Sequence, residues 1–255
     1  MENFRYFLFL AYNGSGFHGW QEQPNAHTIQ AEIQYVLKVL TGNPCQLTGA
    51  GRTDTGVHAR RFYAHFDSDK LINEVELSQL VYKLNRFLPQ SIVIYDIFRV
   101  KPNVHARFSA ISRTYHYYIS RRKDPFSNDQ SWIYTPELDI EKMEYAAGII
   151  KDYSDFSCFS KSRTQTLTND CNIYESFFIS QDHFLIYHVK ANRFLRNMVR
   201  AIVGTLMEVG KDNISMDELR TILEKGSRSD AGMSVPACGL FLEDVEYPED
   251  IRIRP

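Results

Sequence analysis

Two hydrophobic periodicities alternate along this chain of 255 residues. Runs rich in aromatic and β-branched side chains, with apolar residues at every second position, predict strands. Between them, apolar residues recur every third or fourth position, which is the spacing of an amphipathic helix. The alternation predicts an α+β fold with antiparallel or mixed sheets, and a hairpin that turns at Gln181-Asp182. The predicted strands are 4–12, 45–50, 61–67, 92–99, 112–120, 172–180, 183–190 and 240–246.

Four helices are predicted from apolar stripes with capping or terminating residues at their ends. Their marker residues, in chain order, are Thr28 and Gly42, Leu77 and Pro89, Asp139 and Ile150, and Ser215 with Glu218 and Gly226.

A fifth helix is predicted over 192–208, where apolar residues form an i, i+4 stripe. Arg193, Arg196, Asn197 and Arg200 then share another face, and no acid precedes Glu208 on the same segment. A solvated basic face is the ordinary interpretation, but a partner from elsewhere in the chain or an RNA would also fit.

Composition and length limit the class of protein. With 44% hydrophobic residues the chain can bury a core, and its length fits one large domain or two small ones. No linker or low-complexity tract is visible. From the order of the predicted strands and helices we predict two halves, 1–103 and 104–255, each mixing strands with helices. The apolar start is too short to span a bilayer, and the four cysteines form no C-x-x-C pair. These features favour a cytoplasmic protein with reduced thiols and no zinc site.

The charges are segregated although the net charge is only −2. The segments 33–66, 97–123 and 183–207 hold 15 of the 29 Lys and Arg residues but only one of the 31 acids, Asp54. This pattern is what a positive RNA-binding groove on an otherwise acidic protein would produce. Chance clustering in strands, which are poor in acids, is the alternative.

Asp54 stands in the stretch GAGRTDTGVHARRF, residues 49–62, whose glycines permit tight turns. A Walker phosphate loop needs Gly-Lys-Ser/Thr, a common glycosidase site needs two carboxylates, and a metal site needs ligands that are missing locally. What remains is a single carboxylate in basic surroundings, either a nucleophile or a loop-capping residue. An arginine partner would keep such a carboxylate ionised.

The same stretch resembles the active-site motif of the tRNA pseudouridine synthase A family, which usually has alanine where Thr55 stands. Four further stretches resemble that family in the same order and cover essentially the whole chain. They are GFHGWQEQPNAHTIQ (16–30), HARFSAISRTYHYYI (105–119), KANRFLRNMVRAIVGTLMEVG (190–210) and AGMSVPACGLFLEDVEYP (231–248).

The resemblance implies a pseudouridine synthase fold of two RNA-recognition-like subdomains sharing a central mixed, largely antiparallel sheet. It implies an isomerase that acts on uridines 38–40 of the tRNA anticodon stem-loop as a homodimer, without cofactor or metal. By the same resemblance Asp54 is the nucleophile and Tyr115 packs against the target base. Arg200 pairs with the aspartate, and Arg52 steadies the flipped nucleotide.

Two other functions stay open at this point. The chain could be a catalytically silent tRNA-binding relative, or an active paralogue with different target uridines. Without the resemblance, Tyr115 would be taken for a half-buried strand residue and Arg52 for a solvated loop residue. The sequence also leaves open the dimer interface, the order of the 154–170 loop, and whether Asp54 attacks uracil C6 or acts at the ribose.

Overall fold

The computed structural model describes residues 3–160 and 168–253 and divides the chain into two compact units. Unit 1 comprises residues 1–111 together with 242–255, and unit 2 comprises residues 112–241. The predicted division into 1–103 and 104–255 differs from these units at the boundary and at the C-terminus. The C-terminal segment returns to unit 1, which a division into two consecutive halves does not anticipate.

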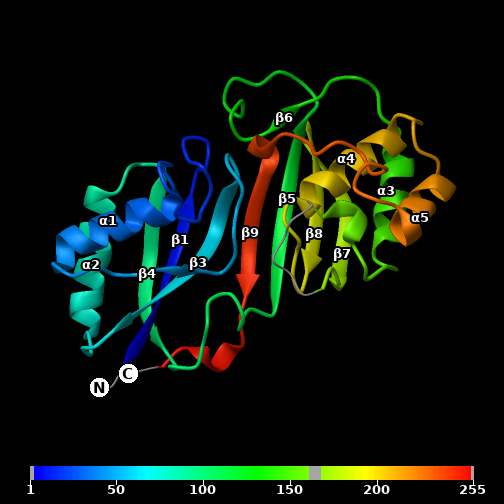
Figure 1. Cartoon of the computed structure of the whole chain (residues 1–255). Helices are drawn as coiled ribbons and strands as arrows, with labels where there is room; N and C mark the ends of the chain where they lie inside the picture. The colour runs from blue at the N-terminus through cyan, green and yellow to red at the C-terminus, as the bar shows by residue number, and fades with distance from the viewer. Residues whose placement is uncertain (1–2, 161–167, 254–255) are drawn as a thin grey trace. The chain divides into compact units, whose positions relative to one another are not determined.

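Unit 1 is built on the strand order β4-β1-β3-β9, and β2 also pairs with β3. The strand β1 pairs antiparallel with both β3 and β4. Two helices pack together beside these strands (Figure 1). The bounds are β1 Phe4–Tyr12, α1 Ile29–Thr41, β2 Thr48–Gly49, β3 His58–Ser68, α2 Glu74–Phe87, β4 Ile92–Val100 and β9 Leu240–Glu246, of which the first two residues belong to unit 2.

The core of unit 1 follows the period-two pattern of β1. Tyr6, Leu8 and Leu10 are buried on one face, and Phe7 is buried on the other. Phe7 packs in a cluster with Val100, Val104 and Ala106, against which Tyr247 and Ile251 of the returning C-terminal segment also pack. Both faces of β1 are therefore covered, one of them by chain from the far end of the sequence.

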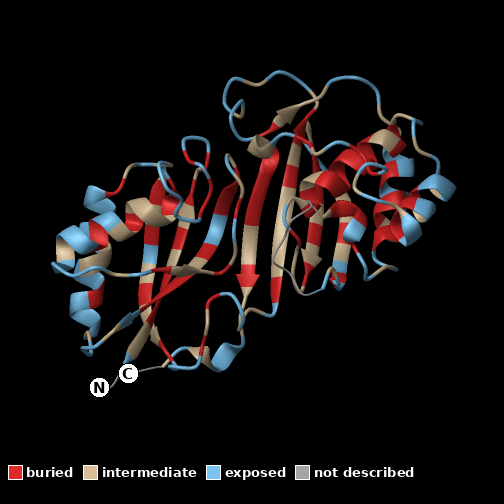
Figure 2. Cartoon of the chain, in the orientation of Figure 1, coloured by how far each residue is buried: buried red, intermediate tan, exposed pale blue. Residues whose placement is uncertain are grey.

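Unit 2 has the strand order β5-β8-β7, with antiparallel pairing throughout, and β6 adds to β5 in parallel. Its helices α3 and α4 pack against each other, and they also pack against the strands, α3 against β7 and α4 against β5. Figure 2 shows that α4 is buried over most of its length. The bounds are β5 Ser112–Ser120, β6 Trp132–Ile133, α3 Ile140–Ile150, β7 Ile173–Gln181, β8 Phe184–Ala191, α4 Met198–Gly210 and α5 Met216–Lys225. Short 3₁₀ turns cover Ser157–Phe159, Ala237–Gly239 and Glu249–Ile251.

Most predicted elements are confirmed, and the α+β class with mostly antiparallel strands is confirmed with them. The capping residues Thr28, Asp139 and Ser215 all accept backbone hydrogen bonds at the helix starts. Gly42 ends α1 with φ of 75°, as a left-handed C-terminal residue should.

Two predictions were wrong in detail. The hairpin turns at Asp182-His183, one residue later than predicted, because Gln181 pairs with Phe184. The predicted strand 45–50 shortens to β2, and β6 had no prediction. Of the 154–170 loop, residues 161–167 lie outside the described residues.

The largest error concerns the predicted helix 192–208, which begins only at Met198. Asn192 instead continues strand-like pairing, because its N–H donates to the carbonyl of Asn172. Asn197 has φ of 66°, which a helix interior does not accept. Arg193 and Arg196 therefore lie on a loop before α4 and share no helical face with Arg200.

None of the helices in the described ranges combines the length and the apolar character needed to cross a bilayer.

Candidate active site

Asp54 lies in the loop between β2 and β3, at the first position of a tight turn. Its carbonyl accepts a hydrogen bond of 3.1 Å from the N–H of Val57, and Gly56 has φ of 79°. Positive φ at the third residue is what a type II turn requires, and glycine supplies it without strain. Asp54 is half-buried, while Thr55 is exposed at the tip. The exposed position explains how threonine can replace the alanine usual in the family motif.

A second segment, residues 13–28 after β1, braces this loop from the side. The N–H of Trp20 donates to the carbonyl of Thr53 at 3.2 Å, and the N–H of Gly56 donates to the carbonyl of Phe17 at 3.3 Å. The backbones approach so closely that a Cβ on Gly19 would lie 2.3 Å from the Thr53 oxygen, and Gly19 also has φ of 85°. The bracing therefore holds the backbone on both sides of Asp54.

The residue before Asp54 is anchored by its side chain as well. Thr53 is 8% exposed, and its hydroxyl oxygen lies 2.9 Å from the hydroxyl of Tyr12 at the end of β1. Arg52, one residue earlier, is exposed. The loop thus presents an exposed guanidinium and a half-buried carboxylate on either side of a buried threonine.

Tyr115 lies in the middle of β5 in unit 2, opposite Val189 of β8. It is half-buried, and its ring meets Phe194 edge-on with centroids 5.1 Å apart. Tyr117 follows two positions along the strand, and its buried hydroxyl donates to the carbonyl of Pro236. Burial raises the pKa of Tyr117 well above its ordinary value, so this hydroxyl stays protonated.

Arg200 lies in the first turn of α4 and is tied twice to Val235. Its Nε donates to the Val235 carbonyl at 2.7 Å, and the Val235 N–H donates back to the Arg200 carbonyl at 3.2 Å. Because the guanidinium is planar, a bond from Nε fixes the plane in which the rest of the group lies.

The loop 228–235 that carries Val235 is itself held on α4. Arg228 donates to the Gly232 carbonyl at 3.0 Å and to the Ser234 hydroxyl at 2.7 Å. Asn197 donates to the same hydroxyl at 2.6 Å. The orientation of Arg200 therefore rests on a network that connects the start of α4 to residues 35 and 37 positions later in the chain.

The predicted basic groove needs correction in two places. Arg60 forms an ion pair with Glu243 at 3.0 Å, and Arg61 forms one with Asp244 at 2.9 Å. Both acids lie on β9, almost 200 residues away in the sequence and beside β3 in unit 1. A segment that is free of acids in sequence is therefore not free of them in space.

Arg121, in the acid-poor segment 97–123, donates to the carbonyls of Tyr134 at 2.7 Å and Pro136 at 2.6 Å. These bonds tie the end of β5 to the segment after β6 within unit 2. Over the described residues, no three His, Cys, Asp or Glu side chains gather as metal ligands would.

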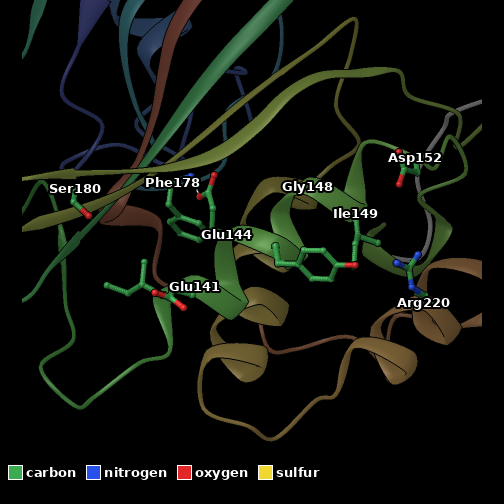
Figure 3. Close-up of a pocket in the computed structure, with 10 residues that line it drawn as sticks. Glu141, Glu144, Gly148, Ile149, Asp152, Phe178, Ser180 and Arg220 are labelled. Carbon is green, nitrogen blue, oxygen red and sulfur yellow. Dashed lines mark hydrogen bonds between the residues drawn. The ribbon is translucent and has the colours of Figure 1, made fainter.

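A separate groove of about 760 Å³ lies between α3, β7 and Arg220 of α5 (Figure 3). Its acids are Glu141, Glu144 and Asp152, and the Glu144 carboxylate accepts a bond of 2.6 Å from the N–H of Phe178. Tyr115 and Arg200 do not line it. Three acids against one arginine disfavour phosphate binding, so this groove is no candidate for the RNA site.

The structure thus holds Asp54 and Arg52 on one loop of unit 1, and Tyr115 and Arg200 within unit 2. Sequence reasoning missed the residues that hold them in place: Tyr12, Thr53, Arg228, Ser234 and Val235. The stretches 16–30 and 231–248 were singled out for their resemblance, but nothing in either indicated which backbone it would brace.

Comparison with known proteins agrees with the motifs. A family model described as tRNA pseudouridine synthase matches residues 153–248. The tRNA pseudouridine synthase A of Parabacteroides distasonis is 46% identical over 247 residues, which cover 97% of this chain and 97% of that protein. That of Bacteroides fragilis is 46% identical with coverage of 97% and 98%, and that of Treponema denticola is 36% identical with coverage of 97% and 94%. Identity of this extent over nearly whole chains shows that the protein belongs to the tRNA pseudouridine synthase A family.

Proposed function

We propose that this protein isomerises uridine to pseudouridine in the tRNA anticodon stem-loop, at positions 38 to 40, with Asp54 as the nucleophile. The observation that carries the proposal is a single carboxylate, half-buried, on a turn whose backbone is bonded on both sides. Loop capping alone does not require such bracing, because a capping aspartate is held by its own bonds to nearby amides. The relatives named tRNA pseudouridine synthase A support the same reaction.

The reaction moves the bond between uracil and the ribose C1′ from N1 to C5 of the base, without a cofactor. The target nucleotide must first leave its stack, which costs a few kcal/mol. Asp54 then attacks, at uracil C6 or at the ribose, and the N1–C1′ bond breaks. The freed uracil rotates, C5 bonds to C1′, and the bond to Asp54 breaks. C5 loses its hydrogen as a proton and N1 gains one, so no oxidant or reductant is needed.

In this proposal Arg200 pairs with Asp54 and balances its negative charge. Its bond to Val235 orients the guanidinium. Tyr115 packs on the face of the flipped base, and its edge-on neighbour Phe194 limits the tilt of the ring. Arg52, exposed beside the nucleophile loop, steadies the flipped nucleotide.

We also propose that the protein works in the cytoplasm, where tRNA is found, as a homodimer whose two copies share one tRNA. Light scattering at micromolar concentration tests the assembly. A mass of about twice 29.7 kDa is expected, and a mass close to 29.7 kDa would refute the dimer.

The reaction itself is tested by tritium release from tRNA carrying 5-tritiated uridine. Forming the C5–C1′ bond must expel this label, so the wild type should release it and Asp54→Ala should not. Asp69→Asn, an exposed carboxylate of unit 1, is the matched control and should behave as wild type. Mapping the modified positions then tests the assignment to 38–40.

Tight tRNA binding without any release by the wild type would instead identify a silent RNA-binding relative. Release that maps to other uridines would identify a paralogue with different targets. Normal release by Asp54→Ala would refute the nucleophile.

A further inference from the structure

The hydroxyl of Tyr12 is a group for which the reaction above has no use. It lies 2.9 Å from the Thr53 hydroxyl, and both residues are buried, at 4% and 8% exposure. Tyr12 ends β1, and Thr53 is the residue immediately before the nucleophile, so the bond joins positions 41 residues apart.

The Tyr12 ring is itself immobilised by the core. It packs edge-on against Phe62 with centroids 5.5 Å apart, and it lies 6.2 Å from the ring of Trp20. Its backbone pairs with Ala59 on one side and Ile92 on the other. The hydroxyl therefore projects from a fixed point of the sheet.

Thr53 is thereby held at two atoms. Its carbonyl accepts from the N–H of Trp20, and its side chain is bonded to Tyr12. The bond to the Thr53 carbonyl restrains the position of the peptide between Thr53 and Asp54. The bond to the Thr53 side chain restrains rotation of the backbone at Thr53. The next residue is Asp54, whose own carbonyl closes the turn with Val57. The orientation of the Asp54 side chain therefore depends on the backbone conformation of Thr53.

We propose that Tyr12 is a positioning residue for the Asp54 nucleophile, acting through its hydrogen bond to Thr53. The inference rests on the proposed function, since it requires that Asp54 react. A nucleophile displaced by about 1 Å loses on the order of a hundredfold in rate. Loss of the Tyr12 hydroxyl should therefore slow the chemical step far more than it weakens tRNA binding.

The chain offers a matched control on the same strand. Tyr6 is fully buried, and its hydroxyl accepts a bond of 2.8 Å from the N–H of Ile72, at the end of β1 away from the Asp54 loop. Tyr6→Phe and Tyr12→Phe each remove one hydroxyl bond from a buried tyrosine and leave one partner unsatisfied. Their effects on folding stability should be similar.

The experiment compares single-turnover tritium release, tRNA affinity and urea unfolding of the two variants. We expect Tyr12→Phe to lower the single-turnover rate by about tenfold or more, with tRNA affinity within about twofold of wild type. We expect Tyr6→Phe to keep the rate within about twofold at a similar loss of stability. Equal rates for the two variants at matched stability would overturn the proposal, since Tyr12 would then be merely structural.

A double-mutant cycle tests the route through Thr53. Thr53→Ser retains the hydroxyl and should remain close to wild type, whereas Thr53→Val should be as slow as Tyr12→Phe. The double variant Tyr12→Phe/Thr53→Val should be no slower than either single variant, because the two groups act as a unit. Additive losses would mean that Tyr12 acts without Thr53 and would overturn the proposed route.

Failure of this inference can be separated from failure of the proposed function. If Asp54→Ala abolishes release while Tyr12→Phe matches Tyr6→Phe, only the positioning role fails. If Asp54→Ala retains release, the nucleophile is wrong and the positioning role fails with it.

Discussion

Arg200 and Val235 hold each other by two hydrogen bonds, one from the guanidinium Nε and one between their backbones. The first bond is made by a nitrogen that lysine lacks. The pair therefore distinguishes a requirement for positive charge from a requirement for an oriented guanidinium.

For this reason we expect Arg200→Lys to lose about tenfold or more in single-turnover rate although it keeps the charge. Arg200→Met should lose more, and tRNA affinity should change far less than the rate in both variants. Arg86→Met, at an exposed position of α2, serves as the charge-removal control. A normal single-turnover rate in Arg200→Met would remove Arg200 from the mechanism.

The ion pair between Arg60 and Glu243 gives opposite predictions for its two members. If Arg60 reaches a tRNA phosphate, Arg60→Gln should flatten the plot of log affinity against log salt by about one unit. Glu243→Gln should strengthen binding and steepen the same plot, because it releases Arg60 from its internal partner. Filter binding between about 50 and 200 mM salt measures both slopes. Slopes unchanged in both variants would place Arg60 outside the RNA contact.

Gly19 tests whether the Asp54 loop depends on its close backbone contact with residues 13–28. Gly19→Ala places a Cβ 2.3 Å from the Thr53 carbonyl oxygen at a residue with φ of 85°. We expect a loss of about 1–3 kcal/mol in the free energy of unfolding, with a fall in turnover as the loop shifts. Gly16→Ala, in the same segment with nothing within 4 Å of its Cβ, should leave both close to wild type. Urea denaturation together with tritium release makes the comparison, and equal behaviour of the two variants would contradict the bracing.

His65 predicts a pH dependence of stability. Its side chain is buried on β3, and its Nδ1 accepts from the N–H of Ala106 at 3.2 Å. Burial, together with the nearby charges of Arg5 and His105, lowers the pKa of His65 from 6.5 to about 4, against the opposing charge of Asp67.

Between pH 6.5 and 4 the unfolded chain therefore binds a proton at His65 that the folded chain does not. The contribution of His65 to stability is complete above about pH 6.5 and is lost as the pH falls toward 4. Allowing for solvent screening, this loss amounts to about 1–2 kcal/mol. His65→Asn keeps an acceptor oxygen but no titrating group, so its unfolding free energy should fall less between pH 7 and pH 4.5. An identical fall in both proteins would show that His65 does not titrate in this way.

Sequence pattern alone predicted most of what is local. The alternation of β1, the capping residues Thr28 and Ser215, and the end of α1 at Gly42 depend on side chains within a few residues of one another. The GRTDTG loop and its similarity to a known family are also local features, because turn chemistry and motif identity are written in consecutive residues.

Only the tertiary structure decided which residues distant in the sequence form hydrogen bonds and ion pairs with each other. Whether the Arg193 segment is helical depended on Asn172, which continues strand pairing with Asn192 and delays the start of α4 until Met198. Whether Arg60 carries a free charge depended on Glu243, 183 residues away.

The bond between Tyr12 and Thr53 and the one between Arg200 and Val235 likewise join segments that the sequence keeps apart. Periodicity reports which side of an element is apolar, but hydrogen bonds and ion pairs act over about 3 Å. Which polar groups come within that distance is decided only when the sheets and loops are packed.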